Sequence, residues 1–153
     1  MNSKPLIYLK TLITIHMALF IGLTLFAIFV YSQNGNFDAD FRGDNVFIYM
    51  VPIAAATGYF ASQFIFKKQL GSIRRESTLN SKLNRYQTAS IVRYALIEAP
   101  AFLALIAYFL SGNAMHLVIA IALLLYFFSL RPTSLKMMNQ IPFTSEEEQQ
   151  FKT

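Results

Sequence analysis

The chain has no cysteine, which excludes a disulfide framework, a thiolate nucleophile and a metal site built on cysteine. Charge is also scarce, because Asp, Glu, Lys and Arg together make up only 14% of the residues. Hydrophobic residues make up 55%, and phenylalanine alone contributes 15 of them. A soluble domain of 153 residues has nowhere to bury so many, so the composition excludes an ordinary soluble protein.

Four apolar stretches fill most of the chain, at residues 11–30, 46–66, 91–110 and 114–130. At about 1.5 Å rise per residue, a helix over each stretch comes close to the roughly 30 Å hydrocarbon core of a bilayer. We therefore predict an all-α, polytopic membrane protein with four transmembrane helices in two hairpins. Residues 1–153 would form a single domain, since the length leaves no room for a separate catalytic module.

Positive charge lies almost entirely on one side of these stretches. Of the 13 Lys and Arg residues, only Arg42 lies on the other side, in the loop after the first stretch. Lys and Arg near short loops are retained on the cytoplasmic face. We therefore predict that both termini, the basic loop at residues 67–90 and the tail at residues 131–153 are cytoplasmic.

The net charge of +5 comes from residues that flank membrane spans and not from a basic groove with interleaved aromatics. This pattern argues against nucleic acid as a partner. It favours the lipid bilayer itself, with anionic lipid headgroups attracted to the basic cytoplasmic collar.

The loop at residues 67–90 is predicted to be partly helical, because Leu79, Leu83 and Tyr86 recur at helical spacing and Ser77 or Thr78 is suited to cap a helix. The third span would then begin as a cytoplasmic helical extension. Its polar face is expected to be solvated, with docking of a partner as the alternative; this face consists of Ser81, Lys82, Asn84 and Arg85.

Two signals mark the tail after the fourth stretch. Pro132 stops the preceding helix, and Thr144 with Glu147 three residues later has the spacing of a capping box. A short acidic C-terminal helix is predicted, with fraying of so short a segment as the alternative.

Small residues recur every four positions in the stretch at 46–66, at Ala54, Gly58 and Ser62. Such a stripe lets another helix approach closely, so these three residues are predicted to pack helices together. Pro52 and Pro100 interrupt hydrogen bonding within their helices, and each frees a carbonyl that a neighbouring group must satisfy.

Glu98 is the only carboxylate inside any of the four stretches. Its depth from the basic side is similar to the depths of His16 and Gln63, about 6 to 9 Å, and Tyr94 lies one turn before it. We predict a polar cluster of His16, Gln63, Tyr94 and Glu98. One interpretation is structural: the cluster fixes helix register, or Glu98 extends toward Arg93. The other interpretation is a proton or cation site.

Residues 89–106 read ASIVRYALIEAPAFLALI. This run resembles the carboxylate-bearing helix of the rotor-ring proteolipid, the c subunit of rotary ATP synthases, in which alanine, leucine, isoleucine and glutamate are followed by small and apolar residues. The resemblance implies that Glu98 carries a proton or sodium ion. The stretches at 11–30 and 114–130 have no counterpart in a two-helix subunit. The whole chain resembles four-span bacterial inner-membrane proteins, which implies a cell membrane location but no mechanism.

No catalytic constellation occurs in the sequence. Its two histidines, His16 and His116, are expected at opposite membrane faces and so cannot share a metal, and there is no glycine-rich phosphate loop. We expect no enzyme activity, no metal and no cofactor. The leading hypothesis is an accessory or scaffold subunit, working as a homo-oligomer or with a membrane-protein partner. The alternative is a proton- or cation-handling protein that uses Glu98.

Overall fold

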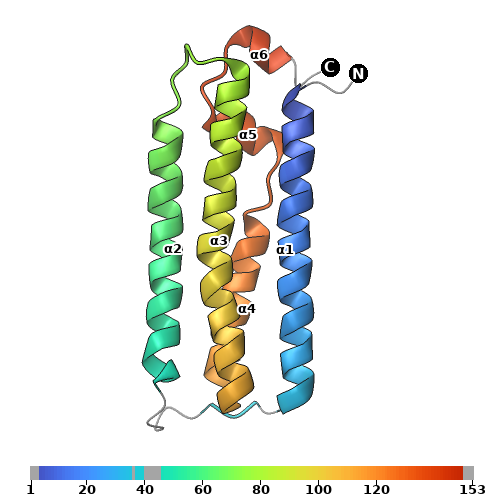
Figure 1. Cartoon of the computed structure of the whole chain (residues 1–153), viewed down its shortest axis with the longest axis vertical. Helices are drawn as coiled ribbons and strands as arrows, with labels where there is room; N and C mark the ends of the chain where they lie inside the picture. The colour runs from blue at the N-terminus through green and yellow to red at the C-terminus, as the bar shows by residue number, and fades with distance from the viewer. Residues whose placement is uncertain (1–3, 36, 40–45, 150–153) are drawn as a thin grey trace.

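The computed structural model describes residues 4–35, 37–39 and 46–149, and in these ranges the chain is helical with no strand (Figure 1). Arg42 and Lys152, which contributed to the predicted charge asymmetry, lie outside the described residues. The helices are α1 (Lys4–Asn34), α2 (Phe47–Gly71), α3 (Leu79–Ser111), α4 (Ala114–Ser129), α5 (Ser134–Gln140) and α6 (Ser145–Gln149).

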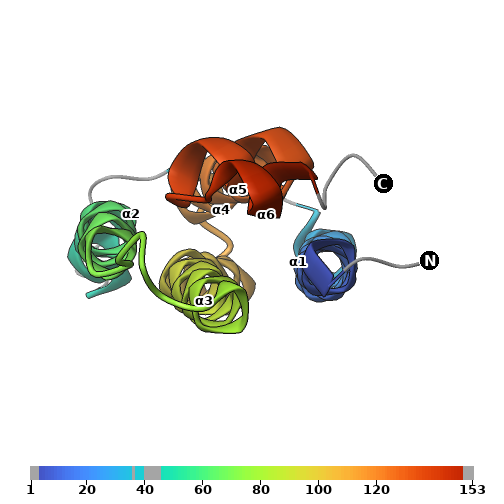
Figure 2. The ribbon, with the colours of Figure 1, turned by 90° about the horizontal axis from the view of Figure 1, so that it is seen from above.

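The four long helices form an elongated bundle with α3 and α4 at its centre. Both α3 and α4 contact each other and each of the two outer helices, and α1 and α2 lie on opposite sides (Figure 2). The start of α1, the α2–α3 connection and the tail helices α5 and α6 all lie at one end of the bundle (Figure 1). We call this the basic end, because it carries Lys67, Lys68, Arg74, Arg75 and Lys136.

Three helices, α1, α2 and α3, are long and apolar enough to cross a membrane. A fourth span exists if α4 and α5 count as one broken helix, because the two are bent by 79° at a short break. Alone, α4 has 16 residues, or about 24 Å of helix, which is less than the hydrocarbon thickness. The structure therefore supports three of the four predicted spans, and the fourth if α4 and α5 are counted together.

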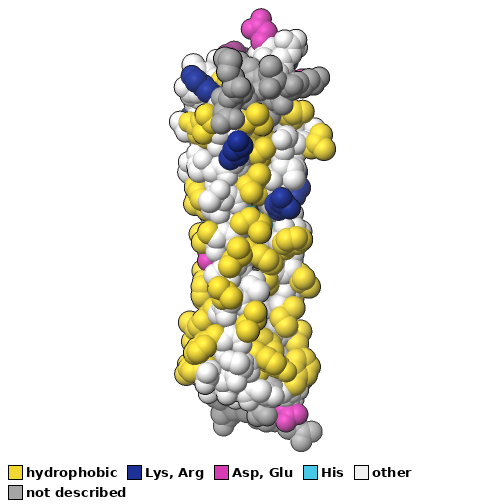
Figure 3. Space-filling view, turned by 90° about the vertical axis from the view of Figure 1, so that its right-hand side faces the viewer, with side chains coloured by type: hydrophobic (Ala, Val, Ile, Leu, Met, Phe, Trp, Pro, Cys, Tyr) yellow, Lys and Arg dark blue, Asp and Glu magenta, His cyan; other side chains and the backbone are white. Residues whose placement is uncertain are grey.

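Large apolar side chains cover the outside of the helical bundle along its length. The Lys and Arg side chains seen in Figure 3 lie toward the basic end. Ile53, Phe60, Phe64 and Leu125 each expose more than three fifths of their surface. Apolar side chains so exposed along the bundle are compatible with a membrane protein, in which such a surface would face lipid.

The predicted helical extension is present, since α3 begins at Leu79, well before the third apolar stretch. Its cap is Thr78, whose side-chain oxygen accepts a hydrogen bond from the Ser81 backbone N–H at 3.4 Å. At the other end, Gly112 takes a left-handed backbone conformation with φ of 68°, which glycine adopts without strain. This turn reverses the chain into α4.

The tail folds back onto the extension, and here the expected solvation of Lys82 is wrong. The Lys82 side chain is fully buried, and its Nζ donates to Glu147 Oε2 at 2.8 Å. The predicted capping box forms as well, because Glu147 Oε2 accepts from the Thr144 backbone N–H at 2.8 Å. Burial raises the pKa of Glu147, but the bonds from Lys82 and Thr144 outweigh this and hold it below its ordinary value. Lys82 is buried because α6 covers it, a contact between segments far apart in sequence.

Candidate functional site

The small-residue stripe of α2 faces α3 within the same chain. Gly58 is buried, and a Cβ atom built on it would lie 2.5 Å from the Leu96 carbonyl oxygen and 2.8 Å from Pro100 Cγ. Pro100 has no N–H to donate to Leu96 O in its own helix. The carbonyl that Pro100 frees thus lies against the Gly58 backbone. Ser62 is fully buried and Ala54 is half-buried on the same helix.

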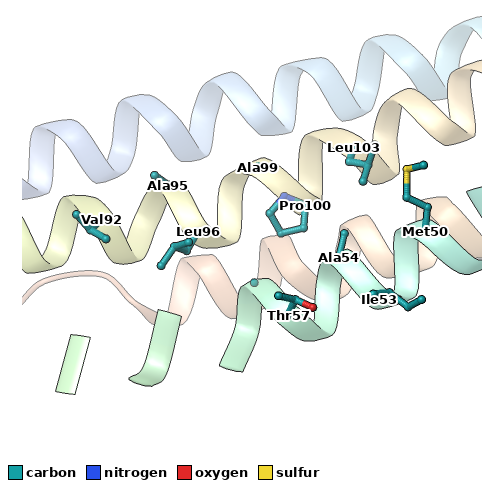
Figure 4. Close-up of a pocket in the computed structure, with 11 residues that line it drawn as sticks. Met50, Ile53, Ala54, Thr57, Val92, Ala95, Leu96, Ala99, Pro100 and Leu103 are labelled. Atoms are coloured by element: carbon teal, nitrogen blue, oxygen red, sulfur yellow. The ribbon is translucent and has the colours of Figure 1, made fainter. Parts of the chain in front are cut away.

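An apolar groove of about 770 Å³ runs along this α2–α3 contact and opens to the outside of the bundle (Figure 4). Met50, Ala54 and Thr57 line it from α2, and Ala99 and Leu103 line it from α3. Its lining is almost wholly apolar, so in a membrane it offers a surface for acyl chains or for another apolar helix.

His16 is buried between α3 and α4. Its Nε2 donates to the Phe127 carbonyl oxygen at 2.9 Å, because a carbonyl only accepts, and so Nε2 carries the proton. Its ring stacks on Phe127 at 4.7 Å between centroids and meets Tyr94 edge-on at 5.1 Å. Of the predicted cluster, His16 and Tyr94 are therefore in contact, through their rings and not through a hydrogen bond.

Gln63 belongs to a different group, which includes two residues that sequence reasoning did not place there. The Arg93 guanidinium donates to Gln63 Oε1 and to the Tyr126 hydroxyl, each at 3.2 Å, and Gln63 also donates to the Tyr126 hydroxyl. Arg93 further lies over the Phe66 ring, 4.5 Å from its centroid. The available signal was that Arg93 lies inside the 91–110 stretch, where a cation needs partners.

Glu98 stands apart from both groups. It is half-buried, and within the described part of the chain its carboxyl forms no hydrogen bond or ion pair, including none with Arg93. No ion pair therefore joins Glu98 to Arg93 among the described residues. Helical geometry accounts for this, because Glu98 lies five residues after Arg93 and so about 140° further around α3, which directs the two side chains to different sides of the helix.

The predicted cluster of four is thus three separate features: the His16–Tyr94 ring contact, the Gln63–Arg93–Tyr126 hydrogen bonds and the isolated Glu98 carboxyl. Among the residues that the structure describes, no group of three or more His, Asp or Glu side chains is arranged to hold a metal ion.

Comparisons with protein-family models, with curated proteins and with solved structures find no match to this chain.

Proposed function

We propose that this chain is a multi-pass protein of a bacterial inner membrane, without enzyme activity, that serves as an accessory or scaffold subunit. In this proposal α4 and α5 together make the fourth span, and both termini are cytoplasmic. The clustering of Lys and Arg at the basic end supports this orientation, since positive residues near short loops remain on the cytoplasmic side.

The observation that carries the proposal is the half-buried, unpaired carboxyl of Glu98. A carboxyl group in hydrocarbon is unfavourable by a few kcal/mol or more unless a donor or counter-ion meets it. Within the described residues of one chain none does. Glu98 is only half-buried, so a donor from another molecule can reach it.

The occupant we propose is a transmembrane helix of another membrane protein with a hydrogen-bond donor, such as Ser, Thr, Asn or Lys, at the level of Glu98. Apolar neighbours on α3 support this, because Ala95 and Phe109 are exposed on either side of Glu98 along the helix. Such a helix would cover apolar surface and satisfy the carboxyl at the same time.

The test is photo-crosslinking in native membranes, with the crosslinking residue placed at Ala95, one turn from Glu98. The matched control carries it at Leu125 of α4, whose side chain is 67% exposed. We expect a discrete protein crosslink from position 95 and none from 125. Glu98→Leu should abolish that crosslink, and Glu98→Gln should retain it because an amide still hydrogen-bonds. Crosslinks unaffected by Glu98→Leu contradict the proposal, and a crosslink to a second copy identifies a homo-oligomer.

The alternative is proton or cation handling by Glu98, supported by the same half-buried, unpaired carboxyl. It differs in the consequence of Glu98→Gln, because an amide cannot exchange a proton and a carrier would lose all activity. Carbodiimide labelling of Glu98 across pH and sodium concentration separates the two functions. Protection by sodium favours the carrier, and labelling that is blocked only in the assembled complex favours the scaffold.

A further inference from the structure

Two polar cavities at the basic end are both lined by Arg93, and neither is lined by Glu98. One has a volume of about 280 Å³ and is lined by Tyr86, Arg93 and Lys136 among others. The other has a volume of about 320 Å³ and is lined by Gln63, Lys67 and Arg93 among others. Arg93 borders both cavities, so a group in either one lies beside its guanidinium.

The charge around these cavities has one sign. Lys67, Arg93 and Lys136 line them, and neither lining contains an Asp or Glu residue. Among the described residues the one ion pair is that of Lys82 with Glu147, so Arg93 has no carboxylate partner there. A cation this far inside a protein needs a counter-charge, because half-burial removes much of its water.

Hydrogen-bond donors also remain unused on the two cations Arg93 and Lys136. Arg93 Nε is buried and has no partner in the described part of the chain. Lys136 Nζ donates to the Ser129 carbonyl at 2.8 Å and the Arg131 carbonyl at 3.1 Å, and an ammonium group has a further N–H beyond these two. The hydroxyls of Tyr86, Ser90 and Tyr126 complete a polar wall.

We propose that the cavities around Arg93 form a binding site for a phosphate-type anion, held by Arg93 and Lys136. A guanidinium binds phosphate through paired N–H donors, and an ammonium adds a point charge. The anion supplies the negative charge that the cavity lining lacks.

The source we favour is the phosphate of an anionic lipid headgroup, an identification that rests on the proposed membrane topology. In that topology the fourth span is broken by the 79° bend between α4 and α5, and Lys136 lies in α5, at the basic end of this span. Its neighbour Leu135 is 69% exposed, as expected for an apolar residue that faces lipid close to the headgroups. Soluble phosphate is the other source of the same chemistry.

The experiment is native mass spectrometry of the purified full chain, released from bilayers of phosphatidylcholine with added phosphatidylglycerol. The variants are Arg93→Gln and Lys136→Gln. The matched control is Arg75→Gln, which removes the same charge from an exposed residue that lines neither cavity. We expect each cavity variant to weaken retention of phosphatidylglycerol by at least about tenfold, as loss of a charge-assisted hydrogen bond does, and the control to retain it.

Titration with inorganic phosphate distinguishes the sources. If Arg93→Gln weakens binding of inorganic phosphate but does not weaken retention of the lipid, the site exists and its ligand is soluble phosphate. Lipid and phosphate binding equal to the control in both cavity variants overturns the site. Because Arg93 also bonds Gln63 and Tyr126, Lys136→Gln decides the question if Arg93→Gln fails to fold. Glu98→Leu should retain the lipid, so failure of the scaffold proposal would leave this result unchanged.

Discussion

Gly58→Ala is the sharpest test of how α2 and α3 are held together. The new Cβ would lie 2.5 Å from Leu96 O, a backbone atom, and 2.8 Å from Pro100 Cγ. Ordinary contact begins near 3.4 Å, so the helices must move apart by about 0.9 Å at this point. Overpacking of this kind typically destabilises a protein by about 1–3 kcal/mol. The full loss of stability is expected here, because close packing, and not the hydrophobic effect, holds helices together in lipid.

Gly22→Ala in α1 is the matched control, since a Cβ at Gly22 meets nothing within 4 Å. Both substitutions gain the same helix propensity of alanine over glycine, so their difference isolates the clash. The assay is reversible unfolding in mixed micelles, with sodium dodecyl sulfate as denaturant and far-ultraviolet circular dichroism as the signal.

We expect Gly58→Ala to be less stable than Gly22→Ala by about 1–3 kcal/mol. Adding Pro100→Ala should recover part of the loss, because it removes the Cγ contact and returns an N–H donor to Leu96 O. Equal stability of Gly58→Ala and Gly22→Ala would refute the close α2–α3 packing described above.

Three further predictions concern the tail and the core. Glu147→Gln should destabilise docking of α6 by about 3–5 kcal/mol, since it leaves Lys82 buried without its carboxylate, whereas Lys82→Met should destabilise it less. Hydrogen exchange of residues 144–149 measures both effects. A larger loss of stability in Lys82→Met than in Glu147→Gln would contradict the pairing. The pKa of Glu147 is lower in the folded protein than its ordinary value of 4.5, so the ion pair should stabilise the tail fully at a pH above 4.5 and lose that contribution as the pH falls through the lower, folded pKa. Amide hydrogen exchange of the tail that loses protection between pH 7 and 5 would oppose this. His16→Phe should lower the free energy of unfolding by only about 0.5–1.5 kcal/mol, because the ring stack persists and the Phe127 carbonyl still accepts from the Leu130 N–H. The same variant should leave carbodiimide labelling of Glu98 unchanged. Altered labelling would mean that His16 and Glu98 are coupled.

The helical content and several helix ends could be predicted from the sequence, because they depend on local chemistry, but α1 is longer than its apolar stretch and α5 was not predicted. Apolar runs predicted the long helices, and the capping residues Thr78 and Thr144 predicted helix starts that the structure contains. The fourth apolar stretch was also located correctly, but α4 alone is too short to span and needs the bend into α5 to be counted as a span. Membrane orientation remains a prediction from charge.

The candidate site could be predicted only in part. Depth along each helix placed His16 and Tyr94 at one level, and their rings do meet. Depth does not determine which side of a helix a residue occupies relative to its neighbours, and this is why Glu98 and Gln63 separate from that pair. Arg93, read from sequence as a flanking charge, is held by Gln63 and Tyr126 from two other helices.

By itself, the sequence determined where the chain is apolar, where charge lies and where the capped helices α3 and α6 begin, since each of these properties belongs to residues close together in the chain. Only the tertiary structure decided that Lys82 is buried against Glu147, that Gly58 packs on the carbonyl freed by Pro100, and that Glu98 is left without a partner among the described residues. These contacts join distant segments, and they depend on how each helix is rotated about its axis. That rotation is selected by the packing of the whole bundle and leaves no trace in any one stretch of sequence.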